Sequence, residues 1–130
     1  MTCPDCGSET LAFPVPEQYR DALPGEEGGV AVCTHCLTMQ PASDVPSEVP
    51  EFQQLSDAFP SNREAALPMV LVVGLLSNLA LYRTEISDLL GAVERAGADP
   101  LLVLDRLERD PELDPATDLS GRRRQLEQLL

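Results

Sequence analysis

Four cysteines are the residues of this chain whose types and spacing can do chemistry. They form two C-x-x-C pairs and are the only cysteines present: Cys3, Cys6, Cys33 and Cys36. Thiolate sulfur suits Zn²⁺, and a C-x-x-C turn directs two sulfurs at one point. Residues 7–32 separate the two pairs, so a fold that brings the pairs together completes a tetrahedral set. We therefore predict a structural Zn²⁺ site with these four ligands.

A C-x-x-C pair can also form a dithiol redox site. A thioredoxin-like site needs a C-x-x-C that opens a helix within a βαβ pattern, and neither pair has that setting. Residues 1–45 are too few to bury a sufficient hydrophobic core, whereas a structural metal contributes on the order of 10 kcal/mol to folding. The metal interpretation is therefore preferred. A redox or metal-handling protein ranks third among the functions considered, after a protein adaptor and a nucleic-acid-binding protein.

Residues 1–45 must contain the elements that position the cysteines. Apolar runs at 10–15 and 30–32 predict two short strands, each next to a C-x-x-C pair. Between them, residues 16–23 begin with a proline and predict one or two helical turns, and the glycine-rich residues 25–29 predict a tip. A hairpin with a C-x-x-C at each end is the layout of a zinc ribbon.

A family resemblance supports this layout. Cys3-Pro4-Asp5-Cys6-Gly7 resembles the C-P-x-C-G knuckle of zinc ribbons and of rubredoxin, and Cys33–Cys36 supplies a second such turn. Over its whole length the chain resembles small acidic haloarchaeal proteins with an N-terminal zinc ribbon and no assigned function. Leu37 departs from the pattern, since these families usually have glycine there. We therefore expect a weaker N–H-to-sulfur turn around Cys33, and no rubredoxin-type iron site.

His35 is the only histidine. Its place inside the second C-x-x-C predicts a side chain that points outward, because four thiolates already complete a tetrahedral ion. No second histidine or paired acid accompanies it, and the sequence contains no phosphate-binding glycine motif. We therefore predict no catalytic residue and a non-enzymatic protein.

The charge of the chain restricts its partners. The formal net charge is −13, and all nine basic residues are arginine. An acidic surface without lysine stays soluble at high salt and indicates a halophilic protein. Acidic residues outnumber basic ones in both parts of the chain, which disfavours nucleic-acid binding. No signal-peptide pattern precedes the first cysteine, which predicts a cytoplasmic location.

Residues 46–60 divide the chain into two predicted modules. They form a proline-rich linker with a short helix, between a zinc ribbon at 1–45 and a helical bundle at 61–130. Apolar residues recur at helical spacing through the second module and predict roughly three to five helices. The predicted fold class is therefore α+β: a small N-terminal β-hairpin zinc ribbon followed by an all-α bundle.

The most apolar segment is residues 65–82. Ser61 and Glu64 match a capping box ahead of it, with Ser61 as the N-cap residue. The run approaches the roughly 20 residues that cross a bilayer, but polar and small residues interrupt it. We predict a central bundle helix or a homodimer interface rather than a membrane span. Three of these residues share one face that another helix can approach closely: Gly74, Ser77 and Asn78.

The only basic cluster consists of Arg122, Arg123 and Arg124. The simpler interpretation is a solvated helix face on which Arg123 pairs with Glu127 at i+4. The functional interpretation is a contact with RNA, DNA or another anionic partner. The function predicted overall is a zinc-binding adaptor for an unknown protein partner, with nucleic-acid binding as the alternative.

Overall fold

A computed structural model describes residues 2–23, 25 and 27–129 of the protein. Pro24 and Glu26, in or beside the predicted tip, and Leu130, at the end of the predicted bundle, lie outside the described residues. The elements are, in chain order, β1 (Thr10–Pro14), α1 (Glu17–Arg20), β2 (Gly29–Cys33), β3 (Met39–Pro41), η1 (Phe52–Gln54), α2 (Arg63–Leu75), η2 (Leu76–Asn78), α3 (Arg83–Arg95), α4 (Pro100–Glu108) and α5 (Leu119–Glu127). The predicted α+β class is confirmed.

The strands form one antiparallel sheet in the order β1-β2-β3. Thr10 lies opposite Cys33, so the register brings the start of β1 and the end of β2 together, each beside a cysteine pair. The third strand was not expected from the sequence. It is three residues long and ends in Pro41, which an edge strand tolerates because its outer side needs no ladder hydrogen bond.

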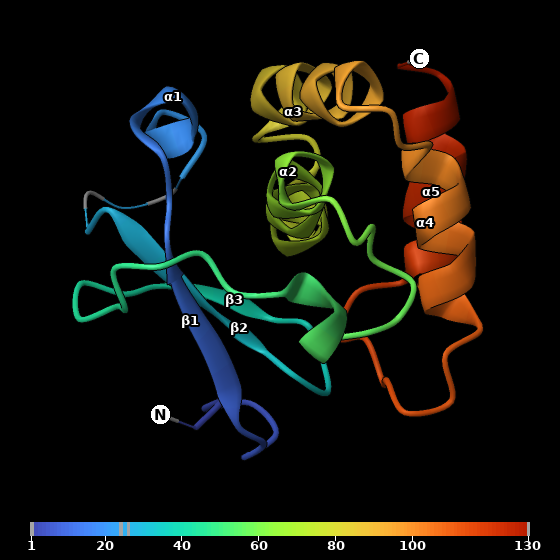
Figure 1. The fold of residues 1–130 in the computed structure, drawn as a ribbon. Helices are drawn as coiled ribbons and strands as arrows, with labels where there is room; N and C mark the ends of the chain where they lie inside the picture. Colours follow the sequence, from blue (N-terminus) through green and yellow to red (C-terminus); the bar gives the residue numbers. More distant parts are fainter. Residues whose placement is uncertain (1, 24, 26, 130) are drawn as a thin grey trace.

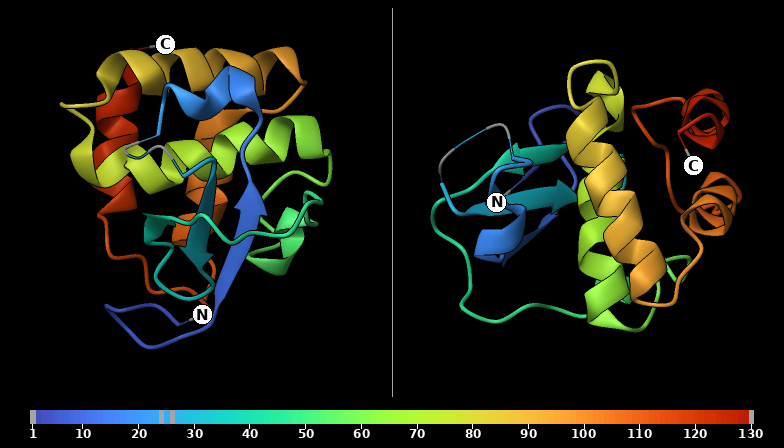
Figure 2. Two further views of the ribbon diagram at one scale, coloured as in Figure 1. Left: turned by 90° about the vertical axis from the view of Figure 1, so that its left-hand side faces the viewer. Right: turned by 90° about the horizontal axis from the view of Figure 1, so that it is seen from above.

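The helices are layered on one face of the sheet. α2 lies between the sheet and α3, while α4 and α5 lie side by side along one side of this stack (Figures 1 and 2). Because neighbours surround α2 on several sides, every residue from 65 to 73 is buried. At Gly74 the close neighbour is a strand, not the predicted helix: a Cβ there would lie 2.6 Å from the Met39 side chain.

The ends of α2 differ from the sequence prediction. Its N-cap is Asn62 rather than Ser61, and the Asn62 side chain accepts a 3.0 Å hydrogen bond from the Glu64 N–H. Asparagine caps as well as serine does, so the helix begins one residue later than predicted. The helix ends at Leu75, and none of the described helices is both long and apolar enough to cross a membrane. Apolar side chains of residues 65–76 are buried within this chain, and the homodimer stays a prediction.

One cluster of buried apolar side chains runs through the sheet, the predicted linker and the helices. Phe13 of β1 meets Phe52 of η1 edge to face, with ring centroids 4.9 Å apart. Ser56 donates a 2.6 Å hydrogen bond to Asp110, which joins the linker to the loop between α4 and α5. The linker at 46–60 therefore supplies core side chains, and the independence of the two modules stays a prediction.

Candidate metal centre

The four cysteine sulfurs gather at the end of the sheet where β1 begins and β2 ends. All four Sγ atoms lie within 4.8 Å of one another. Two sulfur contacts join the pairs crosswise: Cys3 to Cys36 at 3.7 Å and Cys6 to Cys33 at 3.3 Å. A tetrahedral ion with metal–sulfur bonds of about 2.3 Å would hold its sulfurs about 3.8 Å apart. The four thiols are free of disulfides and are close enough to hold a metal ion.

The two pairs sit on the same backbone turn. We call residues 3–8 the first knuckle and residues 33–38 the second knuckle. In each knuckle, the fourth residue after the first cysteine donates its N–H to the carbonyl of that cysteine. The N–H of the same cysteine donates to the carbonyl of the fifth residue after it. These bonds measure 2.8 and 2.8 Å in the first knuckle and 3.2 and 2.9 Å in the second. The partners are Gly7 and Ser8 in the first knuckle and Leu37 and Thr38 in the second.

This turn requires a left-handed residue in both knuckles. Gly7 has φ 80° and Leu37 has φ 63°. The left-handed region costs a residue with a Cβ roughly 1–2 kcal/mol, and the burial of the Leu37 side chain in the main core offsets that cost. The N–H groups of His35 and Cys36 both lie 3.4 Å from the Cys33 sulfur, so the N–H-to-sulfur turn forms with leucine at position 37, and its weakness relative to glycine stays a prediction.

A hydroxyl residue follows each turn and contacts its second cysteine. Thr38 Oγ1 lies 3.1 Å from the sulfur of Cys36, and Ser8 hydrogen-bonds to Cys6 through its backbone and its side chain. Donors of this kind offset the charge of metal-bound thiolates. Neither Ser8 nor Thr38 is among the predicted site residues. The signal that identifies them is the pattern C-x-x-C-x-[ST], which occurs at both pairs.

The two knuckles shift the pKa values of their second cysteines in opposite directions. The backbone and side-chain hydrogen bonds from Ser8 lower the pKa of Cys6 to about 5. Burial raises the pKa of Cys36 to about 12. At neutral pH and without metal, Cys6 is therefore a thiolate and Cys36 a thiol. A metal ion that binds all four sulfurs must displace the proton of Cys36.

The second knuckle is covered by the loop between α4 and α5. The Asp114 N–H donates to the His35 carbonyl at 2.9 Å, and the Ala116 N–H donates to the Cys36 carbonyl at 3.0 Å. The His35 side chain is half-buried rather than outward-facing as predicted, and its Nδ1 is buried without a hydrogen-bond partner. The loop therefore fixes this side of the site against the helices.

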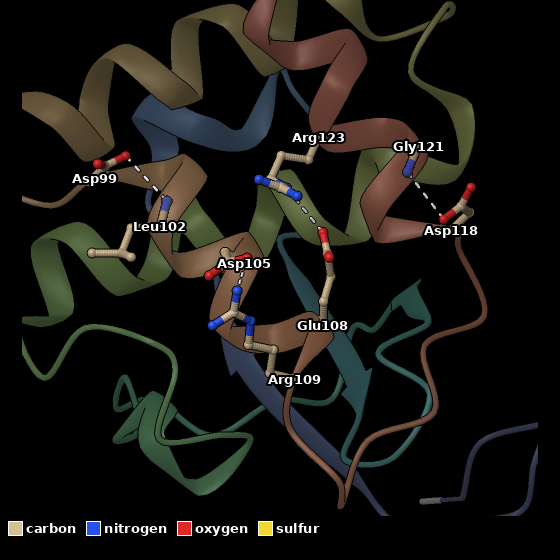
Figure 3. Close-up of polar contacts among 8 residues, drawn as sticks. All are labelled: Asp99, Leu102, Asp105, Glu108, Arg109, Asp118, Gly121 and Arg123. Atoms are coloured by element: carbon tan, nitrogen blue, oxygen red, sulfur yellow. Dashed lines mark hydrogen bonds and ion pairs between the residues drawn. The ribbon is translucent and has the colours of Figure 1, made fainter.

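The three arginines of α5 lie in three different surroundings. Arg123 Nε pairs with Glu108 Oε1 of α4 at 3.1 Å (Figure 3), rather than with the predicted acid at i+4 on its own helix. Arg122 is half-buried beside Ser77, and Arg124 is exposed. The cluster seen in the sequence is therefore not one surface patch, and a contact with an anionic partner stays a prediction.

The fold and the site define an α+β protein with a four-cysteine cluster at one end of a small sheet. This arrangement is consistent with the predicted zinc ribbon. Residues 2–130 match a family of unknown function, DUF6276, and the chain belongs to that family. No curated protein and no solved structure matches the chain.

Proposed function

We propose that the protein is a non-enzymatic adaptor whose four cysteines bind a structural Zn²⁺ ion. The observation that carries the proposal is the gathering of four sulfurs within 4.8 Å. Zinc is favoured because it takes four thiolates in a tetrahedron. Four protein ligands also leave no open position for a substrate or an activated water, which supports a structural role over a catalytic one.

The first knuckle is the surface that we propose for a protein partner. Pro4, Asp5 and Gly7 are exposed, whereas the second knuckle is covered by residues 114–116. A bound metal would hold the exposed turn rigid. A rigid turn loses little conformational entropy on binding, so its contacts contribute more fully to affinity.

Metal analysis tests the zinc part of the proposal. We expect one zinc ion per wild-type chain and none in the Cys33→Ser variant. We also expect Cys33→Ser to lose the order of the sheet while the helices persist, measured by NMR and circular dichroism. Thr34→Ser, which changes a neighbouring side chain that is not a ligand, serves as the matched control. An ordered sheet in the fully reduced, metal-free protein would contradict this role for the ion.

Affinity capture tests the adaptor part. The net charge of −13 supports a halophilic setting, so the capture is done at high potassium chloride concentration. We expect Asp5→Arg to lose the partner that wild type retains, while Asp57→Arg, an equal charge change at an exposed linker residue, retains it. Equal capture by both variants would contradict the proposed surface. Capture abolished by nuclease treatment would favour the nucleic-acid alternative.

A further inference from the structure

The surface between α5 and the turn before α3 contains a hollow. Two adjoining depressions of about 370 and 290 Å³ share Arg122 and Gln125. Their walls come from two segments that are distant in sequence, residues 77–83 and residues 116–129. We call this surface the arginine hollow. Its principal lining residues are Ser77, Leu79, Ala80, Arg83, Arg122 and Gln125.

The arginine hollow carries positive charge in a chain of net charge −13. Arg83 and Arg122 both line it. Asp118 is the one carboxylate among the described residues that line it, and its Oδ1 is already engaged as the cap of α5, 3.1 Å from the Gly121 N–H (Figure 3). Arg122 donates to the neutral side chain of Gln125 at 3.0 Å, which leaves its charge uncompensated.

Three of the other arginines bind carboxylates of the chain itself. The described ion pairs join Arg63 to Glu51, Arg109 to Asp105 and Arg123 to Glu108. With acidic residues so abundant, the two arginines of the hollow could have been neutralised in the same way. The fold instead leaves them together and facing a depression, where a carboxylate from another molecule can reach both.

An apolar surface adjoins the two arginines. Leu79, Ala80 and Leu129 contribute to the wall. Leu81, in the same turn, is 72% exposed, which makes it the most exposed large apolar side chain of the described residues. Arginine is enriched among the residues that dominate binding energy in interfaces, and the apolar side chains near these two arginines can be buried by a bound partner.

We propose that the arginine hollow binds an acidic protein segment that carries an apolar side chain between its carboxylates. Arginine forms bidentate hydrogen bonds with a carboxylate, and the leucines receive the apolar side chain. Charge complementarity favours a short peptide over nucleic acid. Duplex DNA carries one charge about every 1.7 Å and would extend beyond two arginines over a strongly acidic surface. The hollow adds a second binding surface to the proposed adaptor and does not depend on the metal.

The test measures binding of a fluorescent synthetic peptide to the full-length protein. The peptide has leucines between aspartates and glutamates, and its partner peptide has asparagine and glutamine in their place. We expect the Arg83→Gln, Arg122→Gln double variant to bind the acidic peptide about a hundredfold more weakly, about tenfold for each arginine. The matched control replaces two exposed arginines outside the hollow, Arg106 and Arg124, and is expected to bind as wild type does.

Three further variants separate the hollow from general effects. Ser77→Glu adds a carboxylate to the hollow without removing an arginine, and we expect it to weaken binding as well. Leu81→Ser is expected to weaken binding, whereas Leu102→Ser is not, although Leu102 is also exposed, at 45%. Thermal unfolding of each variant verifies the fold.

Three results would overturn the proposal. They are equal binding of the acidic and neutral peptides, equal losses in the hollow and control variants, and tighter binding of a single-stranded oligonucleotide than of the acidic peptide. Zinc content is measured in the same samples. A protein that contains no zinc but still binds the acidic peptide would contradict the proposed zinc site. The same result would support the proposed peptide binding at the arginine hollow.

Discussion

The two knuckles share one backbone turn but differ in their exposure and in the residue at the left-handed position. The first is exposed at Pro4 and Asp5 and has glycine at its left-handed position. The second is covered by the loop between α4 and α5 and has a buried leucine there. The same backbone hydrogen bonds form in both knuckles, so the turn itself does not depend on these differences.

The difference shows that the second knuckle joins the site to the core, whereas the first knuckle is exposed on the surface. At the second knuckle, burial supplies the free energy that holds Leu37 in a left-handed conformation and raises the pKa of Cys36. At the first knuckle, hydrogen bonds from Ser8 stabilise the thiolate of Cys6 in the presence of water. The exposed half is the surface that we propose for a partner, and the buried half joins the site to the core.

The pH dependence of metal affinity is the largest effect expected from this comparison. Cys36, with its pKa raised to about 12, must lose a proton on binding at neutral pH, so affinity rises with pH by about tenfold per pH unit for each displaced proton. Cys6, with its pKa lowered to about 5, adds to the slope only below about that pH. Competition with a calibrated chelator measures the slope. An affinity independent of pH around neutrality would contradict the assignment for Cys36.

Substitution of Leu37 tests how burial offsets backbone strain. Leu37→Ala removes a buried side chain and keeps the left-handed strain, so we expect a loss of about 2–4 kcal/mol in the free energy of unfolding. Leu37→Gly removes the same side chain but relieves the strain, and should be about 1 kcal/mol more stable than the alanine variant. Denaturant unfolding of the metal-loaded protein measures both. A glycine variant less stable than the alanine variant would show that the left-handed strain is absent.

Amide exchange tests the connection between the second knuckle and the helices. Removal of the metal should free the carbonyls of His35 and Cys36 from fixed positions, so the amides of Asp114 and Ala116 should exchange about tenfold faster. The amide of Ile86, which donates to the Tyr82 carbonyl within the helical part, is the internal control. Unchanged exchange at Asp114 and Ala116 after chelation would mean that the loop is held independently of the site.

The smallest effect is expected at Gly7. An added Cβ there meets no atom within 4 Å, so Gly7→Ala costs only the left-handed conformation, about 1 kcal/mol. Denaturant unfolding of the metal-loaded variant measures this cost. The same substitution at Gly97, which also has φ in the left-handed region and open space around it, is the matched control away from the metal site. A loss at Gly7 far above that at Gly97 would show an additional role in metal binding.

The sequence predicts the four-cysteine cluster because the residue type and the C-x-x-C spacing are local features. It also predicts the α+β class, because strand and helix periods are properties of short segments. Features that depend on distant contacts are not predictable in this way. Leu37 is left-handed because a core surrounds its side chain, and β3 forms because β2 offers it an edge. Residues 114–116 reach the second knuckle because α4 and α5 lie along one side of the stack that the sheet, α2 and α3 form.

X-ray absorption at the zinc edge tests the central claim most directly. The purified full-length protein should contain one zinc ion with four sulfur neighbours at about 2.3 Å. That result would establish that both knuckles bind the same ion. Nitrogen or oxygen neighbours in place of sulfur, or a fully reduced protein that binds no zinc, would contradict it.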